Sequence, residues 1–359
     1  MKNNLTPIPI AIVGLGRAGW TLHLEAILDF PQYKIVSVAD PMPDRRKEAE
    51  DRTGCVSYET IEQLLQETTA VVVVIATPTH LHYRDTLMVL NSGRHCILEK
   101  PMGSNFEEAR EMVKVAREKN LQLLVNYPYF FSGEYEHLKR VVASGKLGEI
   151  FHLRVFAGNY ARRCDWQTLK KNGGGQLNNH GTHMLSMIVP LLNSHVTSLY
   201  ADLRNIKNPG DAEDHVHLVL KNTNQVTIDL VVSSAIAHGC PRWIICGKYG
   251  TFVSDGKKGK LHYYDPSQVE ELSLIDDAAP GRRYHEEVLP WKEEEVDAGD
   301  PRMESFIRSF HQSVLNVLLE GKEPQISPEN ALEVVRVVEL ASKASENGSW
   351  LDEEKCAHL

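Results

Sequence analysis

The hydrophobic positions in the first third of the chain form short apolar runs that alternate with longer amphipathic segments. We expect strands near residues 8–13, 34–39, 70–76, 94–98 and 121–125. Helices are expected between them, near residues 17–29, 43–53, 59–66, 81–92 and 105–119. The run from 70 to 76 is entirely apolar, as in a strand buried on both faces of a parallel sheet. The alternation therefore predicts an α/β domain with a parallel, doubly wound sheet.

The pattern changes after about residue 126, where β-branched segments are separated by glycines. Strand-like segments lie near residues 150–157, 215–220, 226–236 and 242–246, with one glycine-rich helix start among them. Such a mixture predicts an α+β domain. With 359 residues, the chain is also longer than a single domain usually is. We therefore predict two domains, at residues 1–125 and 126–359.

Two helices are expected near the end of the chain. Asp300 and Ser327 each precede a proline at the start of an amphipathic segment, as a helix N-cap residue does. Gly321 and Gly348 are placed to end these helices. The acidic, mixed stretch from 285 to 300 is interpreted as an exposed connection.

Charge and composition exclude some classes of partner. The net charge is −9, and the lysines and arginines are scattered rather than clustered, so we expect neither a nucleic acid nor a membrane surface as partner. The six cysteines show no CxxC spacing, and the amino terminus lacks the apolar stretch of a signal peptide. No run is long enough to cross a bilayer. These features predict a cytoplasmic protein with free thiols.

The first strand leads into a glycine pattern that is typical of dinucleotide binding. Gly14 permits a tight turn, Gly16 lets the backbone approach a pyrophosphate, and Gly19 lets the next helix pack closely. Arg17 and Ala18 complete this loop at the helix N-terminus. The alternative interpretation is an ordinary strand, turn and helix.

An acidic residue supports the dinucleotide interpretation. Asp40 ends the second strand about 20 residues after the last glycine, where a ribose diol is bound in such folds. The carboxylate favours NAD, because it would repel the 2′-phosphate of NADP. Arg45 and Arg46 follow closely enough to leave NADP open, and Asp40 as a simple cap is the alternative.

Two further groups follow strand ends, where ligands of open α/β sheets collect. Thr77, Pro78, His80 and His82 follow the third expected strand, and we expect them at the cofactor, although Thr79 would also cap the helix from 81. Glu99 and Lys100 follow the fourth strand and precede a proline. Partial burial beside a nicotinamide would lower the pKa of Lys100, so this lysine is a candidate for sharing or relaying a substrate proton.

The second domain contributes a glycine-rich helix start. Asn179 and His183 follow Gly173, Gly174 and Gly175, and at i,i+4 spacing they share one helix face. Such a pair can bind a hydroxyl, and a histidine can remove its proton near neutral pH. A core histidine satisfied by a backbone carbonyl is the equal alternative.

Together these motifs resemble the glucose-fructose oxidoreductase, inositol dehydrogenase and MocA family (Gfo/Idh/MocA). The resemblance rests on the Gly14–Gly19 loop, Thr77-Pro78 with His80 and His82, Glu99-Lys100-Pro101, and the Gly173 run with Asn179 and His183. It implies a Rossmann domain and a second domain with an open, largely antiparallel sheet. In many members that sheet mediates dimers or tetramers. It also implies that Lys100 and His183 act in hydride transfer between NAD(P) and a secondary alcohol of a sugar or cyclitol.

The chain departs from the family pattern at two positions. Asn179 and Ser186 stand where dehydrogenases of the family often carry aspartate. An amide does not stabilise a protonated histidine as a carboxylate does. Asn179 is still expected to orient a substrate hydroxyl.

Aromatic and charged residues outside these motifs are candidates for substrate binding. Tyr127 begins an aromatic run that either stacks on a sugar or belongs to the core. Arg163 and Trp166 lie in a loop before the glycines, and a solvated loop is the alternative. His180 with His183, and His215 with His217, raise the possibility of metal binding, but no second ligand pair has a recognisable spacing and we predict no metal site.

The sequence therefore predicts an NAD-dependent oxidoreductase, with NADP possible, that acts on a carbohydrate or cyclitol and forms a homodimer or homotetramer. His183 is expected to be the general base, Lys100 to polarise the oxygen and relay its proton, and Asn179 to hold a hydroxyl. Two alternatives are a glycosidase that uses NAD for transient oxidation and elimination, and a non-catalytic NAD-binding sensor.

Overall fold

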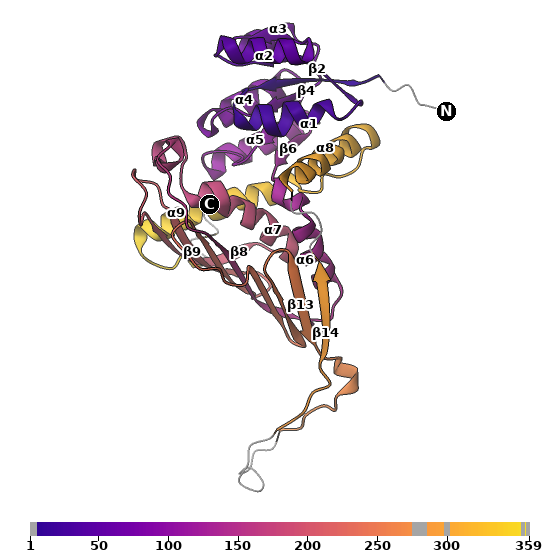
Figure 1. Cartoon of the computed structure of the whole chain (residues 1–359), viewed down its shortest axis with the longest axis vertical. Coiled ribbons are helices and arrows are strands. Elements are labelled where there is room, and N and C mark those ends of the chain that lie inside the picture. Colours follow the sequence, from indigo (N-terminus) through magenta and orange to yellow (C-terminus); the bar gives the residue numbers. More distant parts are fainter. Residues whose placement is uncertain (1–5, 275–285, 298–301, 353–355, 357–359) are drawn as a thin grey trace, which may run out of the picture.

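The computed structural model describes residues 6–274, 286–297, 302–352 and 356. It contains a six-stranded parallel sheet and an eight-stranded, mostly antiparallel sheet. Figure 1 shows the first sheet with its helices at one end of the molecule and the second sheet at the other, with α8 and α9 between them. Both predicted fold classes are confirmed.

The first sheet has the strand order β3-β2-β1-β4-β5-β6. Its strands are β1 (Ile8–Val13), β2 (Tyr33–Ala39), β3 (Val56–Tyr58), β4 (Val72–Ile75), β5 (His95–Glu99) and β6 (Leu123–Asn126). The order reverses between β1 and β4, so the carboxyl ends of these strands frame a crevice in which such folds bind ligands. All four residues of β4 are buried, as its apolar run predicts.

The connecting helices of this domain are close to the expected ranges. They are α1 (Glu25–Leu28), α2 (Pro43–Thr53), α3 (Ile61–Glu67), α4 (Thr79–Asn91) and α5 (Phe106–Glu118). Two details differ from expectation. The first helix begins as a π-helix at Ala18–Leu24 before α1. Thr79 lies inside α4 and does not cap it, because Pro78 occupies the N-cap position.

The second sheet has the order β14-β13-β12-β11-β7-β10-β9-β8. Its strands are β7 (Ile150–Gly158), β8 (Val196–Arg204), β9 (His215–Asn222), β10 (Thr227–Ser233), β11 (Trp243–Gly247), β12 (Gly250–Ser254), β13 (Lys258–Tyr263) and β14 (Lys292–Asp297). Among these neighbours only β10 and β7 run parallel. Leu218 and Leu230 are fully buried on one face, whereas His217 and Asp229 lie on the other.

The strand β14 corrects an expectation, because the stretch from 285 to 300 was expected to be a connection. Residues 292–297 instead pair with β13. The described part from 286 to 291 has no regular structure, and residues 298–300 lie outside the described residues.

Four α-helices follow β6 in the described part of the chain: α6 (Gly133–Ala143), α7 (Thr182–Leu192), α8 (Met303–Glu320) and α9 (Pro328–Asn347). Ser327 caps α9, and Gly321 and Gly348 end α8 and α9 in the left-handed conformation, as predicted. The predicted cap Asp300 lies outside the described residues, and α8 begins at Met303. Among the described helices, none combines the length and apolarity needed to cross a membrane.

The last two helices contact both halves of the molecule. α9 packs against β8 and α7 of the second domain and against α5 of the first, and α8 contacts α1. The polypeptide therefore returns to the first domain, and Lys100, directly after β5, reaches the backbone of Asn179 just before α7.

Candidate active site

The glycine loop after β1 has the geometry that a dinucleotide requires. Gly14 has φ +90°, and a Cβ added to it would lie 2.7 Å from the carbonyl oxygen of Ala76. A Cβ on Gly19 would overlap the carbonyl of Gly14. A Cβ on Gly16, by contrast, would meet no protein atom within 4 Å. Protein packing therefore requires Gly14 and Gly19, while the space beside Gly16 fits the approach of a pyrophosphate.

Asp40 holds this loop from the end of β2. Its buried carboxylate accepts hydrogen bonds from the amides of Leu15 (2.7 Å) and Met42 (2.9 Å). Arg45 lies 3.5 Å from the same carboxylate, and its side chain is 42% exposed. Asp40 thus has the position of a ribose-binding acid, and Arg45 is available beside it.

The turns after β4 and β5 are joined by His82. This buried side chain has Nδ1 2.8 Å from the carbonyl oxygen of Pro101 and Nε2 2.8 Å from that of Thr77. Thr77 also donates a hydrogen bond to Asp85 (2.9 Å). His82 therefore positions the predicted cofactor-binding turns rather than facing the crevice itself, whereas His80 and Pro78 are exposed.

Lys100 reaches from the first domain to the second. Its Nζ donates a 2.8 Å hydrogen bond to the backbone carbonyl of Asn179. The pKa of Lys100 is lowered to about 8, chiefly because the ammonium group is buried; the charge of Arg17 contributes to this shift and the Glu99 carboxylate opposes it. A substantial fraction of this lysine is therefore neutral slightly above neutral pH.

Glu99 is held in a buried polar cluster behind Lys100. Its Oε1 lies 2.9 Å from Nε2 of His23 and accepts a 2.7 Å hydrogen bond from Asn126. Burial opposes ionisation of Glu99, but the contacts with His23 and Asn126 and the charge of Lys100 outweigh it and lower the pKa of the carboxyl. The negative charge next to Lys100 is therefore fixed by hydrogen bonds.

His183 lies beside Lys100 near the start of α7. The helix begins as a π-helix at Leu177–Gly181 and continues as α7, so Asn179 and His183 lie on successive turns. His183 is buried, and its Nδ1 has no hydrogen-bond partner. Burial, Lys100 and His180 together lower its pKa well below 6.5. The imidazole is therefore neutral.

An aromatic wall completes this part of the site. The ring of Tyr129 lies 4.7 Å from that of His183 and 5.6 Å from that of His180, between centroids. Phe306 of α8 lies on Tyr129 at 6.1 Å. The predicted contact residue Tyr127 is instead fully buried in the core, and its hydroxyl has no hydrogen-bond partner. Tyr129, two residues after Tyr127, supplies the aromatic surface of the site.

Of the predicted substrate residues in the second domain, Arg163 lies close to Asn179. With Gln167, Gln176 and Glu213, these two residues line a polar recess of about 10 Å³. Arg163 is also paired with Asp165 at 2.8 Å. Trp166 is 55% exposed on the adjoining turn.

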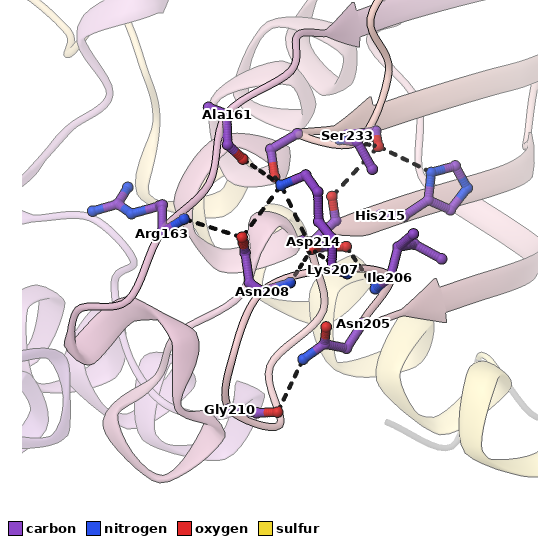
Figure 2. Close-up of polar contacts among 12 residues, drawn as sticks. Ala161, Arg163, Asn205, Ile206, Lys207, Asn208, Gly210, Asp214, His215 and Ser233 are labelled. Carbon is purple, nitrogen blue, oxygen red and sulfur yellow. Dashed lines mark hydrogen bonds and ion pairs between the residues drawn. The ribbon is translucent and has the colours of Figure 1, made fainter.

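Asp214 organises the loops around this recess (Figure 2). Its buried carboxylate accepts hydrogen bonds from three consecutive amides at 2.8 to 3.1 Å, those of Ile206, Lys207 and Asn208. Asn208 in turn accepts a 3.0 Å hydrogen bond from the amide of Arg163. The backbone of the Arg163 loop is thereby fixed, although this loop has no regular secondary structure there.

Several residues of the site were not singled out as such from the sequence. Tyr129 belongs to the aromatic run that begins at Tyr127, although Tyr127 is the residue singled out there. His23 and Asp214 reach their positions through long-range packing, and nothing in their local sequence marks them. His180 carries a visible signal, since it lies between Asn179 and His183, but the sequence suggests only a metal role for it. Among the described residues no group of three or more His, Cys, Asp or Glu side chains is arranged to hold a metal ion.

These features define a dinucleotide-binding oxidoreductase whose cofactor crevice faces a lysine and a histidine. The comparisons identify its family. Residues 8–127 match the oxidoreductase family with an NAD-binding Rossmann fold, and residues 135–253 match the Gfo/Idh/MocA C-terminal domain. The chain belongs to the Gfo/Idh/MocA family and is an NAD(P)-dependent dehydrogenase.

Two relatives match nearly the whole chain, and a third matches about half of it. An uncharacterised oxidoreductase of Schizosaccharomyces pombe is 25% identical, over 96% of this chain and 98% of its own. The scyllo-inositol 2-dehydrogenase (NADP(+)) of Bacillus subtilis is 21% identical over 96% and 95%. The D-glucoside 3-dehydrogenase of Escherichia coli is 29% identical over 54% of this chain and 56% of its own.

Solved structures share the fold. An oxidoreductase from Agrobacterium radiobacter, in complex with NAD+, L-tartaric acid and magnesium, aligns with a TM-score of 0.81 at 21% identity, over 99% of this chain and 100% of that one. GenD2 from gentamicin A biosynthesis, in complex with NAD, aligns with a TM-score of 0.78 at 20% identity, over 97% of both chains.

Proposed function

We propose that this dehydrogenase transfers a hydride between NAD and a secondary hydroxyl of a sugar, sugar derivative or cyclitol. The observation that carries the proposal is the hydrogen bond from Lys100 to the backbone carbonyl of Asn179. Through this contact a lysine with a lowered pKa lies close to His183, at the end of a strand in the sheet that also carries the glycine loop. The names of the relatives support the substrate class, since they include an inositol dehydrogenase and a glucoside dehydrogenase.

The glycine loop and Asp40 are proposed to hold the cofactor. The pyrophosphate would contact the loop residues Gly14, Gly16, Arg17, Ala18 and Gly19, and the ribose would contact Asp40. The nicotinamide half would contact Thr77, Pro78, His80, Glu99 and Lys100. When bound, NAD supplies the hydride acceptor for oxidation of the carbinol carbon. NADP stays possible because Arg45 lies next to Asp40 and because the Bacillus subtilis relative is named for NADP+.

Lys100 and His183 are proposed to share the hydroxyl proton. The sequence predicts His183 as the general base, but its lowered pKa makes it a weak base, and its buried Nδ1 has no acceptor that would stabilise an imidazolium. A base with a pKa nearer the working pH is more effective. We therefore assign proton acceptance to neutral Lys100, while the neutral imidazole of His183 orients the hydroxyl. The carbon loses a hydride, the oxygen loses its proton to Lys100, and a ketone results.

Substrate positioning is proposed for the residues around this pair. Asn179 is expected to hold a hydroxyl of the substrate at the polar recess that Arg163 also lines, and the exposed Trp166 on the adjoining turn is expected to contact the substrate. Tyr129, rather than the buried Tyr127, is proposed to stack on the sugar. An aromatic face beside two imidazoles suits the apolar side of a sugar ring.

The assembly is proposed to be a homodimer or homotetramer in the cytoplasm. The support is the face of the second sheet on which the side chains of Arg154, His217 and Asp229 lie partly exposed. These form a mutually paired polar cluster, with 2.9 Å between His217 and Asp229. Sedimentation velocity would report the oligomeric state, and a monomer would contradict the proposal.

The test of the reaction is the absorbance of reduced nicotinamide after mixing protein and NAD with sugars, sugar acids, glycosides and inositols. We expect a substrate-dependent rise that Lys100→Ala abolishes. An equal rise with Lys100→Ala would contradict the proposed role of Lys100. Hydrolysis of a glycoside without net reduction of NAD would identify the glycosidase chemistry instead.

A further inference from the structure

The side chain of His180 packs against those of His183 and Tyr129, and the reaction described above does not use it. Its ring centroid lies 6.1 Å from that of His183 and 5.6 Å from that of Tyr129. It is half-buried on the π-helix Leu177–Gly181. In the described part of the chain, no protein group hydrogen-bonds to either ring nitrogen of His180.

The π-helical turn explains how the two imidazoles come together. A π-helix has a wider turn than an α-helix, and such turns are frequent at functional sites. Here the π-helix ends at Gly181 and α7 begins at Thr182, between the two histidines. Asn179, His180 and His183 therefore all flank the point that Lys100 reaches from the first domain.

The charges around His180 fix its protonation state. Burial, together with the positive charges of Arg242 and Lys100, lowers the pKa of His180 to about 4. Arg242 is held in place by Glu134, with 2.9 Å between Nε and Oε1, and Glu134 also accepts a 2.6 Å hydrogen bond from Trp243. His183, the other titratable group in contact, is neutral as well. A neutral imidazole offers one donor and one acceptor, which is the complement of a hydroxyl group.

We propose that His180 is a specificity-determining residue, which hydrogen-bonds a second hydroxyl of the substrate next to the one that reacts. The substrate class is then a vicinal diol on a ring, with the reacting oxygen at Lys100 and His183 and its neighbour at His180. The inference rests on the proposed function for the identity of the reacting oxygen. It does not follow from the family motif, which concerns Lys100, Asn179 and His183.

A purely structural role is the competing explanation, in which His180 only packs against Tyr129. The two explanations differ in how the protein treats a substrate that lacks one hydroxyl. A hydrogen bond to a neutral group changes binding by about 0.5 to 1.5 kcal/mol, which corresponds to roughly two- to tenfold. A packing residue changes the binding of both compounds by the same factor.

The experiment pairs diols with their deoxy analogues. Methyl β-D-glucoside is compared with its 2-deoxy and 4-deoxy analogues, and myo-inositol with a deoxyinositol, in the wild type, His180→Phe and His180→Asn. Phenylalanine keeps the ring contact with Tyr129 and removes the polar atoms, whereas asparagine keeps a donor and an acceptor. Both kcat/KM and calorimetric binding to the protein loaded with NADH are measured.

We expect the wild type to prefer a diol over a matching deoxy compound by about three- to tenfold, His180→Phe to bring this ratio close to one, and His180→Asn to restore part of it. Binding that discriminates through His180 without any turnover would support the inference and contradict the proposed hydride transfer. The inference is overturned if the wild type binds no diol, if it binds diol and deoxy compounds equally, or if His180→Phe leaves the ratio unchanged.

Discussion

At the scale of single residues, the glycine loop shows that identical residues serve different purposes. Gly19 has no room for a side chain because of the Gly14 carbonyl, whereas Gly16 has ample room within the protein. The first constraint comes from the fold and the second from a ligand. Substituting each glycine therefore separates folding from cofactor binding.

Gly16→Ala is expected to keep the melting temperature of the wild type within about 2 °C and to weaken NAD binding at least tenfold, because its methyl group occupies the space of the pyrophosphate. Gly19→Ala is the matched control and is expected to destabilise the protein by about 1–3 kcal/mol or more through overpacking. Calorimetry of NAD binding and thermal unfolding measure the two effects. Unchanged NAD affinity in Gly16→Ala would place the pyrophosphate elsewhere.

The pH dependence of oxidation is expected to follow Lys100. Its pKa of about 8 means that the ammonium form predominates at lower pH and cannot accept a proton. We therefore expect kcat/KM to rise with pH and to level off above about 8. Lys100→Arg stays charged throughout and is expected to lose about 10²- to 10⁴-fold in rate, with no inflection. The same inflection in Lys100→Arg would show that another group titrates.

Several residues of the site are predictable from the sequence because strand ends and glycine runs mark them. Lys100 follows a buried strand and His183 follows the Gly173 run, and the packing of the two domains brings them together through the contact of Lys100 with Asn179. Tyr127 and Tyr129 show the limit. They lie two apart in an aromatic run, and only the 3₁₀ turn Pro128–Phe131 decides that the second tyrosine faces the site.

At the scale of elements, apolar periodicity predicts the first sheet better than the second. The strands β1, β2 and β4 to β6 are expected, whereas β3 has only three residues and carries too little pattern. In β14 the sequence is almost entirely charged, and its pairing is supported by polar contacts such as Glu294 with Tyr263 (2.6 Å). Hydrophobic patterns do not identify a strand of this kind.

The connection between the turns after β4 and β5 depends on His82. His82→Phe leaves at least one partly buried carbonyl, that of Thr77 or Pro101, without its partner, so we expect the free energy of unfolding to fall by about 1–3 kcal/mol. His80→Phe makes the same change at an exposed position of α4 and is expected to stay within about 0.5 kcal/mol of the wild type. Chemical denaturation measures both. Equal effects of the two variants would contradict the positioning role of His82.

At the scale of the whole molecule, the end of the chain joins the two sheets. α8 brings Phe306 to Tyr129 at the site and His311 to His23 behind Glu99, with 5.3 Å between the two imidazole centroids. The sequence predicts α8 and α9 as helices but not their return to the first domain, because the apolar face of a helix does not reveal its partner.

Acid is expected to destabilise the protein through its buried histidines. Burial and the neighbouring His23 hold the pKa of His311 well below 6.5. The unfolded chain then binds a proton that the folded chain does not, so stability is present above about pH 6.5 and is lost as the pH falls below it, by up to about 1.4 kcal/mol per pH unit for each group.

We expect His311→Phe to flatten the decline of the melting temperature between pH 6.5 and 5. His238→Phe, at an exposed histidine, is the control and is expected to follow the wild type. A His311→Phe variant with the same decline as the wild type would assign the acid sensitivity to other groups.

The central claim is hydride transfer to a carbinol carbon beside Lys100. Its most direct test supplies NADH carrying deuterium at the transferable position to a panel of keto-sugars and keto-inositols, followed by mass spectrometry of the products. We predict an alcohol that is one mass unit heavier with the wild type, and no such product with Lys100→Ala. Reduced products without deuterium, or equal labelling by Lys100→Ala, would contradict the account.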